Sequence, residues 1–270
     1  MSRALDRNAP IGVFDSGLGG LTVAHAIMQQ LPGESLVYFG DTARVPYGPK
    51  SPETVRRYSH EIAAFLLEQG VKAIVVACNT ATAHALPMLE AELDVPVIGV
   101  VGPGARAAVR ATKSGHIGVI GTEGTIQSGA YVRAIHAESP EATVTALPCP
   151  LFVPLVEEGW TDHAATRLIA TEYLAPFTRD EVDTLLLGCT HYPLLKRVIA
   201  ETIGPAVRLI DSAEETAADT RRMLAEHDLA STESAGNYRF IASDDRQQFL
   251  DLGQRFFGDA LERVEIRTFG

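Results

Sequence analysis

The sequence predicts an α/β protein with two pseudo-symmetric, doubly wound domains whose sheets are mainly parallel. Two unbroken apolar runs, residues 73–77 and 184–188, have the length and composition of parallel strands buried on both faces. Matching positions recur at nearly constant intervals, which are 106 residues from Ile11 to Ile117, 111 from Cys78 to Cys189 and 112 from Gly99 to Asp211. A repeat of this length indicates two similar domains, because solenoid repeats are far shorter.

The first half of the chain alternates strand-like and helix-like segments. The first apolar run ends at Asp15 and leads through a glycine-rich turn into a helix. A loop dense in Pro and Gly, residues 40–51, precedes a helix for which Ser51 is a suitable N-cap. The strands expected here are 11–15, 36–39, 73–77 and 95–101. One expected helix ends near Gln30, the next spans 52–69, and the third ends at about Glu92.

After Gly102-Pro103-Gly104 the same order of segments begins again. We expect strands at 117–121, 142–147, 184–188 and 207–211, a turn at 122–125, a proline-rich loop at 148–159 and a helix at about 162–177. The remaining residues add a strand near 238–242, a helix at about 244–257 and a closing strand near Val264. The predicted domains are 1–101 and 102–210, with residues 211–270 returning to the first domain.

Composition and charge narrow the class of protein. The net charge is −11, and phosphate contact needs clustered Lys and Arg, so no nucleic-acid partner is expected. The chain has no apolar run of about 18 residues that would span a membrane, and its first residues lack an apolar segment of signal-peptide length. Three cysteines, an odd number, argue against a disulfide framework and for a reducing cytoplasm. A homodimer is expected on general grounds.

Cys78 and Cys189 each follow one of the two matching apolar runs directly. The carboxyl ends of parallel strands are where open α/β sheets bind ligands, and the helix N-terminus expected there favours a thiolate. If the two domains face each other across these edges, both cysteines lie in one cleft between them, which is the predicted active site. A single cysteine at such a place is more often a core residue, as we expect of Cys149, but the matched pair favours function.

Two opposed acid/base groups suit racemisation, in which a proton leaves one face of a carbon and another returns to the opposite face. The usual electron sink for such chemistry is PLP bound to a lysine. None of the four lysines, which are Lys50, Lys72, Lys113 and Lys196, lies at a strand end beside either cysteine. A mechanism without a cofactor is therefore expected, with fixed hydrogen-bond donors stabilising the intermediate.

Candidate partners of the thiols lie near the predicted strand ends. Asp15 ends the first strand, and His191 is two residues beyond Cys189. Compact donors for carboxylates are available from Ser16, Asn79, Thr80, Thr122, Thr190 and the backbone of Gly48. The glycines at 17–20 do not match the nucleotide-binding spacing, and the solitary histidines indicate no metal site.

Five segments in the order of the chain together resemble the glutamate racemase family. They are Asp15-Ser-Gly-Leu-Gly-Gly-Leu-Thr22, Tyr38-Phe-Gly-Asp-Thr-Ala-Arg-Val-Pro-Tyr-Gly48, Ala77-Cys-Asn-Thr-Ala-Thr-Ala83, Cys149-Pro-Leu-Phe-Val-Pro-Leu-Val-Glu-Glu-Gly159 and Leu187-Gly-Cys-Thr-His-Tyr-Pro-Leu194. The resemblance extends from about Ile11 to Asp211. It implies PLP-independent interconversion of L- and D-glutamate, which supplies D-glutamate for bacterial peptidoglycan.

The resemblance also implies roles for individual residues. Cys78 would serve the D-enantiomer with help from Asp15, and Cys189 the L-enantiomer with help from His191 and Glu157. The adjacent Glu158 leaves the position of that glutamate open by one residue. The substrate would be held by Asp15, Ser16, Tyr47, Gly48, Asn79, Thr80, Thr122, Thr190 and His191.

Three other functions are compatible with the sequence. A related cofactor-independent racemase could act on aspartate or another acidic amino acid. A cysteine hydrolase or acyl transferase could use Cys189 and His191 as nucleophile and base, which leaves Cys78 without a role. A protein that binds acidic metabolites without catalysis would require no proton exchange.

Overall fold

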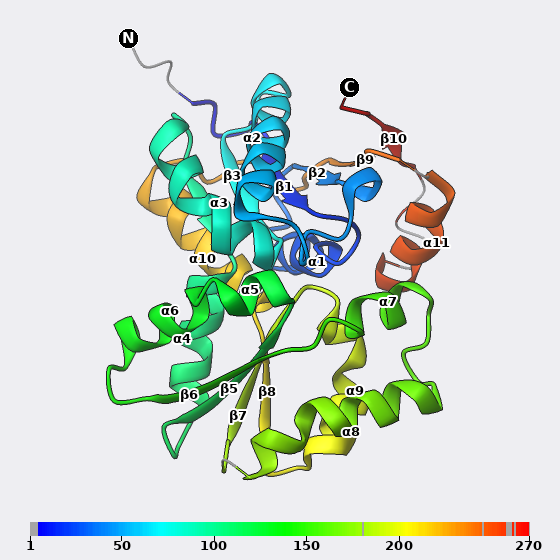
Figure 1. Cartoon of the computed structure of the whole chain (residues 1–270). Helices are drawn as coiled ribbons and strands as arrows, with labels where there is room; N and C mark the ends of the chain where they lie inside the picture. Colours follow the sequence, from blue (N-terminus) through cyan, green and yellow to red (C-terminus); the bar gives the residue numbers. More distant parts are fainter. Residues whose placement is uncertain (1–4, 180, 245, 258–260, 262, 270) are drawn as a thin grey trace. The chain divides into compact units, whose positions relative to one another are not determined.

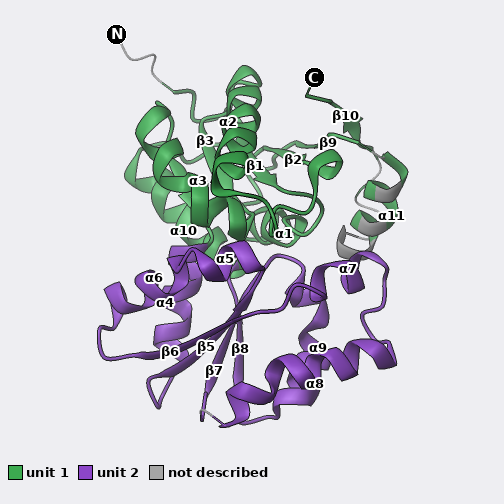
Figure 2. Ribbon diagram, in the orientation of Figure 1, with its two compact units in different colours: residues 1–100, 213–270 green, residues 101–212 purple. Residues whose placement is uncertain are grey.

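The computed structural model describes residues 5–179, 181–244, 246–257, 261 and 263–269. The chain divides into two compact units (Figures 1 and 2), of which unit 1 consists of residues 1–100 and 213–270 and unit 2 of residues 101–212. The domain ranges expected from the sequence, 1–101, 102–210 and 211–270, each include a few residues that lie outside the described ones.

Unit 1 is built on a parallel sheet with the strand order β10-β9-β2-β1-β3-β4 in the described residues. The strands are β1 Ile11–Asp15, β2 Leu36–Gly40, β3 Ala73–Val76, β4 Val97–Gly99, β9 Tyr238–Ala242 and β10 Glu265–Ile266. β1 and β3 are buried at every position, as expected for central strands covered on both faces.

Helices cover both faces of the unit 1 sheet. Those of unit 1 are α1 Leu21–Gln30, α2 Pro52–Glu68, α3 Asn79–Glu92, α10 Ala213–Glu226, α11 Arg246–Phe257 and the 3₁₀ turn η1 Thr42–Arg44. α1 and α10 pack in one apolar cluster, and α2 and α3 in the cluster on the other face. The predicted N-cap of α2 is confirmed, because the Ser51 side chain accepts a hydrogen bond from the Thr54 amide.

Unit 2 is built on a smaller parallel sheet with the order β6-β5-β7-β8. Its elements are α4 Val101–Ala111, β5 His116–Gly121, α5 Glu123–Gln127, α6 Ala130–Glu138, β6 Thr143–Pro148, α7 Phe152–Glu157, α8 Ala164–Arg179, β7 Thr184–Gly188, η2 Tyr192–Leu195, α9 Lys196–Ile203 and β8 Arg208–Asp211. α4 and α6 pack on one face, and α7, α8 and α9 on the other.

The two sheets repeat one topology. The order β2-β1-β3-β4 in unit 1 corresponds to β6-β5-β7-β8 in unit 2, and the strand that precedes each cysteine occupies the same position in both. Ile11 pairs with Ala73 in unit 1, and Ile117 pairs with Thr184 in unit 2. The predicted α/β fold with two parallel sheets is therefore confirmed.

Several predictions of local structure were wrong. α5 includes residues expected to form a turn, and α7 lies in the segment expected to be a proline-rich loop. Gly102-Pro103-Gly104 lies inside α4, and α6 forms where no element was assigned. Pro103 and Pro154 are each the third residue of their helix, where the missing N–H has no intrahelical partner to lose. The expected strand 95–101 is shorter, because α4 begins at Val101.

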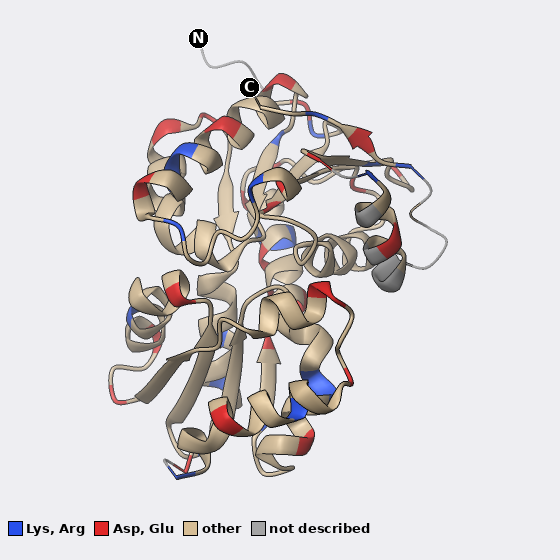
Figure 3. Ribbon diagram, turned by 45° about the vertical axis from the view of Figure 1, so that its right-hand side comes forward, with Lys and Arg blue, Asp and Glu red and all other residues tan. Residues whose placement is uncertain are grey.

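Lys and Arg are scattered among Asp and Glu over the helices of both units (Figure 3). No helix of the described residues combines the length and the apolar character needed to cross a membrane.

Candidate active site

In unit 1 the fold places Cys78 at the start of a helix. β3 ends at Val76, and Cys78 is the N-cap of α3. The Cys78 sulfur accepts a hydrogen bond from the Ala81 amide at 3.4 Å. The thiol donates to the Ser16 hydroxyl, with 3.6 Å between sulfur and oxygen. Cys78 is 4% exposed, so this thiol is almost completely removed from bulk solvent.

Asp15 lies at the same edge of the sheet and is fully buried. Its carboxylate accepts a hydrogen bond from the Gly17 amide at 3.0 Å. A Cβ on Gly20 would lie 2.4 Å from the Cβ of Asp15 and 3.0 Å from that of Ala77. Only glycine therefore allows α1 to begin this close to Asp15 and the strand that leads to Cys78.

Burial and, to a smaller extent, the negative charge of Asp15 together raise the pKa of the Cys78 thiol to about 12. Hydrogen bonds from the Ala81 amide and from Ser16 act in the opposite direction but are weaker. The helix N-terminus favours a thiolate, as expected, but desolvation outweighs this effect for Cys78. At neutral pH this group is a thiol.

The remaining substrate-binding candidates of unit 1 are also buried. Asn79 and Thr80 form the first turn of α3, directly after Cys78. Tyr47 and Gly48 lie in the loop between η1 and α2, and the Tyr47 hydroxyl donates to the Asp41 carboxylate. Burial raises the pKa of Tyr47, and the charges of Asp41 and Cys78 contribute in the same direction.

In unit 2 the second cysteine belongs to a chain of three polar side chains. Cys189 directly follows β7, and its sulfur lies 3.8 Å from Nδ1 of His191. Nε2 of His191 lies 3.3 Å from Oε1 of Glu157. The side chain of His191 is 5% exposed and that of Glu157 is 27% exposed, so the carboxylate connects a buried imidazole to solvent. The order is thiol, imidazole, carboxylate.

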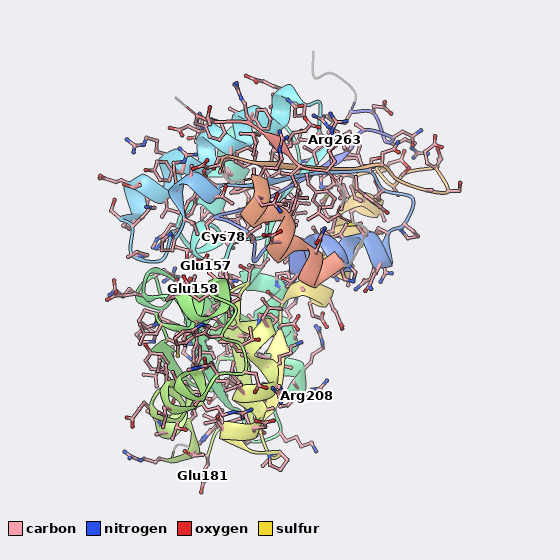
Figure 4. The ribbon with its side chains drawn as sticks, turned by 90° about the vertical axis from the view of Figure 1, so that its right-hand side faces the viewer. Cys78, Glu157, Glu158, Glu181, Arg208 and Arg263 are labelled. Carbon is pink, nitrogen blue, oxygen red and sulfur yellow. The ribbon has the colours of Figure 1, made fainter. Side chains whose placement is uncertain are left out.

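Glu157 and Glu158 are adjacent at the end of α7 (Figure 4). Glu157 is half-buried and lies beside His191. Glu158 is exposed and lines a shallow apolar depression of unit 2 together with Leu151, Pro154, Leu155, Trp160 and Ile169. Only Glu157 of this pair is in contact with the cysteine–histidine pair in the described residues.

The threonines of unit 2 lie at the same strand ends. Thr122 follows β5 and is the N-cap of α5, where its hydroxyl accepts from the Thr125 amide at 3.2 Å. Thr190 is buried between Cys189 and His191. Thr122, Thr190 and Cys189 therefore follow the two neighbouring central strands β5 and β7.

Cys149 is fully buried in the core of unit 2, after β6. Its carbonyl accepts a hydrogen bond from the Tyr192 hydroxyl at 2.8 Å. Burial raises the pKa of its thiol, and the charge of Cys189 contributes. All three cysteines are free, and the described residues contain no group of three or more His, Cys, Asp or Glu side chains that could hold a metal ion.

One buried acid was not assigned to the site from the sequence. Asp41 directly follows β2 and is fully buried, and it accepts hydrogen bonds from Tyr47, Arg44 and Ser243. The carboxylate of Asp41 forms an ion pair with Arg44 at 2.7 Å. The signal that could have identified Asp41 is its position, because it lies at the carboxyl end of a strand of the sheet, as Asp15 and Cys78 do.

Comparison with known proteins identifies close relatives over nearly the whole chain. A glutamate racemase of Geobacter metallireducens is 56% identical over 255 residues, which are 94% of each chain. A crystal structure of a glutamate racemase isoform from Bacillus anthracis matches with a TM-score of 0.93 and 42% identity over 98% of each chain. The structure of the Francisella tularensis glutamate racemase in complex with D-glutamate matches with a TM-score of 0.91 and 39% identity, over 97% of this chain and 98% of that one.

The family model for Asp/Glu/hydantoin racemases matches residues 11–220. This range contains both matched strands, both cysteines that follow them and every candidate residue described above. The resemblance seen in the five sequence segments is thus confirmed by whole-chain comparison. The chain belongs to the Asp/Glu/hydantoin racemase family.

Proposed function

We propose that this protein interconverts L- and D-glutamate without PLP, using Cys78 of unit 1 and Cys189 of unit 2 as the two proton-transfer groups. The observation that carries the proposal is the equivalence of the two cysteines, because each follows the corresponding strand, β3 or β7, of a repeated sheet. A reaction that inverts one carbon needs one acid/base group on each of its faces. The glutamate racemases described above support the choice of substrate.

In the direction from L to D, the thiolate of Cys189 removes the Cα proton and becomes a thiol. The Cys78 thiol then donates its own proton to the opposite face of the carbanion and becomes a thiolate. Cys78 suits this second step, since its pKa of about 12 keeps it protonated at neutral pH. The reverse direction exchanges the two roles.

The polar chain in unit 2 accounts for how Cys189 becomes a base. His191 lies beside the sulfur and accepts the thiol proton at Nδ1, while Glu157 at Nε2 orients the imidazole and stabilises its positive charge. In unit 1 the corresponding neighbour of Cys78 is Asp15, which we propose accepts the thiol proton when the D-enantiomer reacts. Each thiol thus has its own proton acceptor.

Fixed donors take the place of a cofactor in stabilising the enolate-like intermediate. The side chains and amides proposed to hold the substrate are small, buried or both, and all except Tyr47 and Gly48 lie at strand ends or at the start of helices. In unit 1 they are Asp15, Ser16, Tyr47, Gly48, Asn79 and Thr80, and in unit 2 they are Thr122, Thr190 and His191.

We further propose that the product supplies D-glutamate for peptidoglycan synthesis, that the protein works in the cytoplasm and that it is a homodimer. Three free, buried cysteines suit a reducing compartment. Sedimentation equilibrium tests the dimer, and a mass of about one chain would contradict it. Growth of a strain lacking this protein only on added D-glutamate would support the cellular role.

The proposed activity is tested by incubating the protein separately with L-glutamate and L-aspartate in D₂O, with EDTA present and no PLP added. We expect optical rotation to fall to zero for glutamate, with solvent deuterium at Cα of the D-product, and little change for aspartate. Faster reaction of aspartate would identify an aspartate racemase instead. Binding of glutamate without deuterium incorporation would identify a non-catalytic binding protein.

The thiol–imidazole–carboxylate order in unit 2 favours a second candidate, a cysteine hydrolase or acyl transferase. This alternative predicts an acyl-enzyme on Cys189 that forms equally well in Cys78→Ala. Mass spectrometry after incubation with an activated glutamyl ester distinguishes the two, since the racemase proposal predicts no hydrolytic turnover.

A further inference from the structure

The loop that carries Tyr47 and Gly48 is in contact with the C-terminal segment of unit 1 (residues 238–269). β9 lies beside β2 in the sheet (Figure 1), and Gly40 at the end of β2 pairs with Ala242 at the end of β9. The residues that follow the two strands therefore emerge side by side. These are Asp41 and Thr42 after β2, and Ser243 and Asp244 after β9.

Ser243 makes three hydrogen bonds to this loop region and is 1% exposed. Its hydroxyl donates to Oδ1 of Asp41 at 2.9 Å and accepts from the amide of Ala43 at 2.8 Å. Its amide donates to the carbonyl of Gly40 at 3.0 Å. The next residue adds two bonds, because the Thr42 hydroxyl donates to the Asp244 carbonyl and accepts from the Asp244 amide.

Asp41 transmits this contact to the loop. Its Oδ1 is bound by Ser243, and its Oδ2 accepts from Arg44 at 2.7 Å and from the Tyr47 hydroxyl. Its amide donates to the carbonyl of Asp15 at 3.0 Å. Because a fully buried carboxylate needs all its donors, removing one of them changes the preferred orientation of the group and of the tyrosine bound to it.

A second contact involves Phe269 near the end of the chain. The guanidinium of Arg44 lies 3.9 Å from the ring centroid of Tyr58 and 4.8 Å from that of Phe269. Phe269 also packs against Phe39 of β2, with 5.3 Å between ring centroids. Tyr58 in turn packs against Tyr47 at 5.7 Å. The loop is thus held at two places by residues about 200 positions later in the chain.

We infer that Ser243 is a positioning residue for the substrate-binding loop and that it acts through Asp41 on Tyr47. This inference rests on the proposed function, in which Tyr47 and Gly48 hold the substrate. The C-terminal segment would thus help to position the substrate-binding residues of unit 1, although it lies outside the repeated β/α segments of the two units.

The test measures KM and kcat for both enantiomers in Ser243→Ala. We expect KM to rise about tenfold, the loss associated with about one hydrogen bond to a charged group, with kcat changed less than about threefold. The equilibrium constant of a racemisation is 1, so kcat/KM for L- and D-glutamate must fall in the same proportion. Ser243→Cys keeps the side-chain volume with a weaker donor and should shift KM in the same direction, which preserves the test if Ser243→Ala folds poorly.

Glu265→Ala is the matched control. It removes the ion pair to Arg239, which joins β10 to β9 in the same segment at 2.9 Å and does not contact the loop. We expect its KM to remain within twofold of the unsubstituted protein. A role that is merely structural would change the melting temperature in both variants and KM in neither.

A double-mutant cycle with Tyr47→Phe identifies the path through Asp41. If Ser243 acts on Tyr47, the effects of Ser243→Ala and Tyr47→Phe on KM are less than additive. Additive effects, or an unchanged KM in Ser243→Ala while the unsubstituted protein racemises glutamate, overturn the positioning role alone. An unsubstituted protein that does not racemise glutamate overturns the proposed function and this role with it.

Discussion

The two units repeat one arrangement of four strands but surround their cysteines with different chemistry. In unit 1 the thiol of Cys78 caps a helix and has Ser16 and the carboxylate of Asp15 as neighbours. In unit 2 the sulfur of Cys189 lies beside the imidazole of His191, which in turn contacts Glu157. The fold therefore fixes where each thiol lies, whereas the residues around the strand ends determine how the thiol gains and loses its proton.

The units also differ in what supports the loops next to the cysteines. Unit 1 has two additional strands, β9 and β10, and the residues after β9 bind the loop that carries Tyr47. In the described part of unit 2 the sheet ends at β6 and β8. The C-terminal segment therefore extends only one of the two copies of the repeated unit.

The largest expected effect comes from removing either thiol. Cys78→Ser and Cys189→Ser should each lower kcat/KM by about 100-fold to 10,000-fold, the range typical of a lost proton-transfer group, because serine is a far weaker acid. The loss in kcat/KM must be the same for both enantiomers, since the equilibrium constant is 1. Polarimetry from pure L- and pure D-glutamate measures both directions.

Cys149→Ser is the control for this comparison. Cys149 is as buried as the other two cysteines but follows β6, which is not one of the matching strands β3 and β7. We expect its activity per folded molecule to remain within about threefold of the unsubstituted protein, while its stability falls. Full activity in either Cys78→Ser or Cys189→Ser would contradict the assignment.

A smaller effect is expected from the carboxylate of unit 2. Glu157→Gln removes the negative charge beside Nε2 of His191. It should lower kcat by less than about 100-fold, which is the smallest loss expected when a proton-transfer group itself is removed. The matched variant Glu158→Gln changes the adjacent, exposed glutamate, and its kcat should stay within twofold of that of the unsubstituted protein. The reverse order of effects would show that Glu158 acts in the site.

The sequence predicted where both cysteines lie but not all that surrounds them. Buried strands are readable because a central parallel strand is a continuous apolar run, and the polar residues after it lie at the ligand-binding edge. Glu157 could be named only by resemblance, since its contact with His191 depends on α7. That helix contains Pro154 in its first turn, and the sequence of this segment predicted a proline-rich loop. Ser243 could not be identified at all, because nothing local indicates that β9 pairs with β2.

The charge of Asp15 gives a prediction that is specific to unit 1. Burial and this charge raise the pKa of Cys78 to about 12, so the thiolate fraction rises about tenfold per pH unit below that value. Asp15→Asn removes the charge and should lower the pKa, which increases alkylation of Cys78 by iodoacetamide at pH 8 to 9. Racemisation should nevertheless fall, because the proposed proton acceptor is lost.

Peptide mapping by mass spectrometry follows alkylation of Cys78 and Cys149 in the same sample. Cys149 serves as the internal control, since its pKa is raised by burial and by Cys189 rather than by Asp15. Unchanged or slower alkylation of Cys78 in Asp15→Asn would show that Asp15 does not oppose the thiolate.

The smallest expected effect is on stability and compares one glycine of each unit. Gly20→Ala places a Cβ 2.4 Å from that of Asp15 and should destabilise the protein by about 1–3 kcal/mol. Gly102→Ala in α4 meets only the end of the Arg106 side chain, at 3.4 Å, and should be neutral or stabilise by up to about 1 kcal/mol. Urea unfolding measures both. Equal stabilities would mean that the close approach of α1 to Asp15 is not needed.

The proposal that Cys189 deprotonates the L-enantiomer and Cys78 the D-enantiomer is tested most directly with a glutamate analogue that carries a leaving group on Cβ. Both enantiomers of this analogue are used. Elimination from such a compound needs only the first proton transfer, so one thiol is sufficient. Cys78→Ser should still eliminate from the L-enantiomer and not from the D-enantiomer, and Cys189→Ser should show the opposite preference. If both variants prefer the same enantiomer, the two cysteines do not act on opposite faces of one carbon.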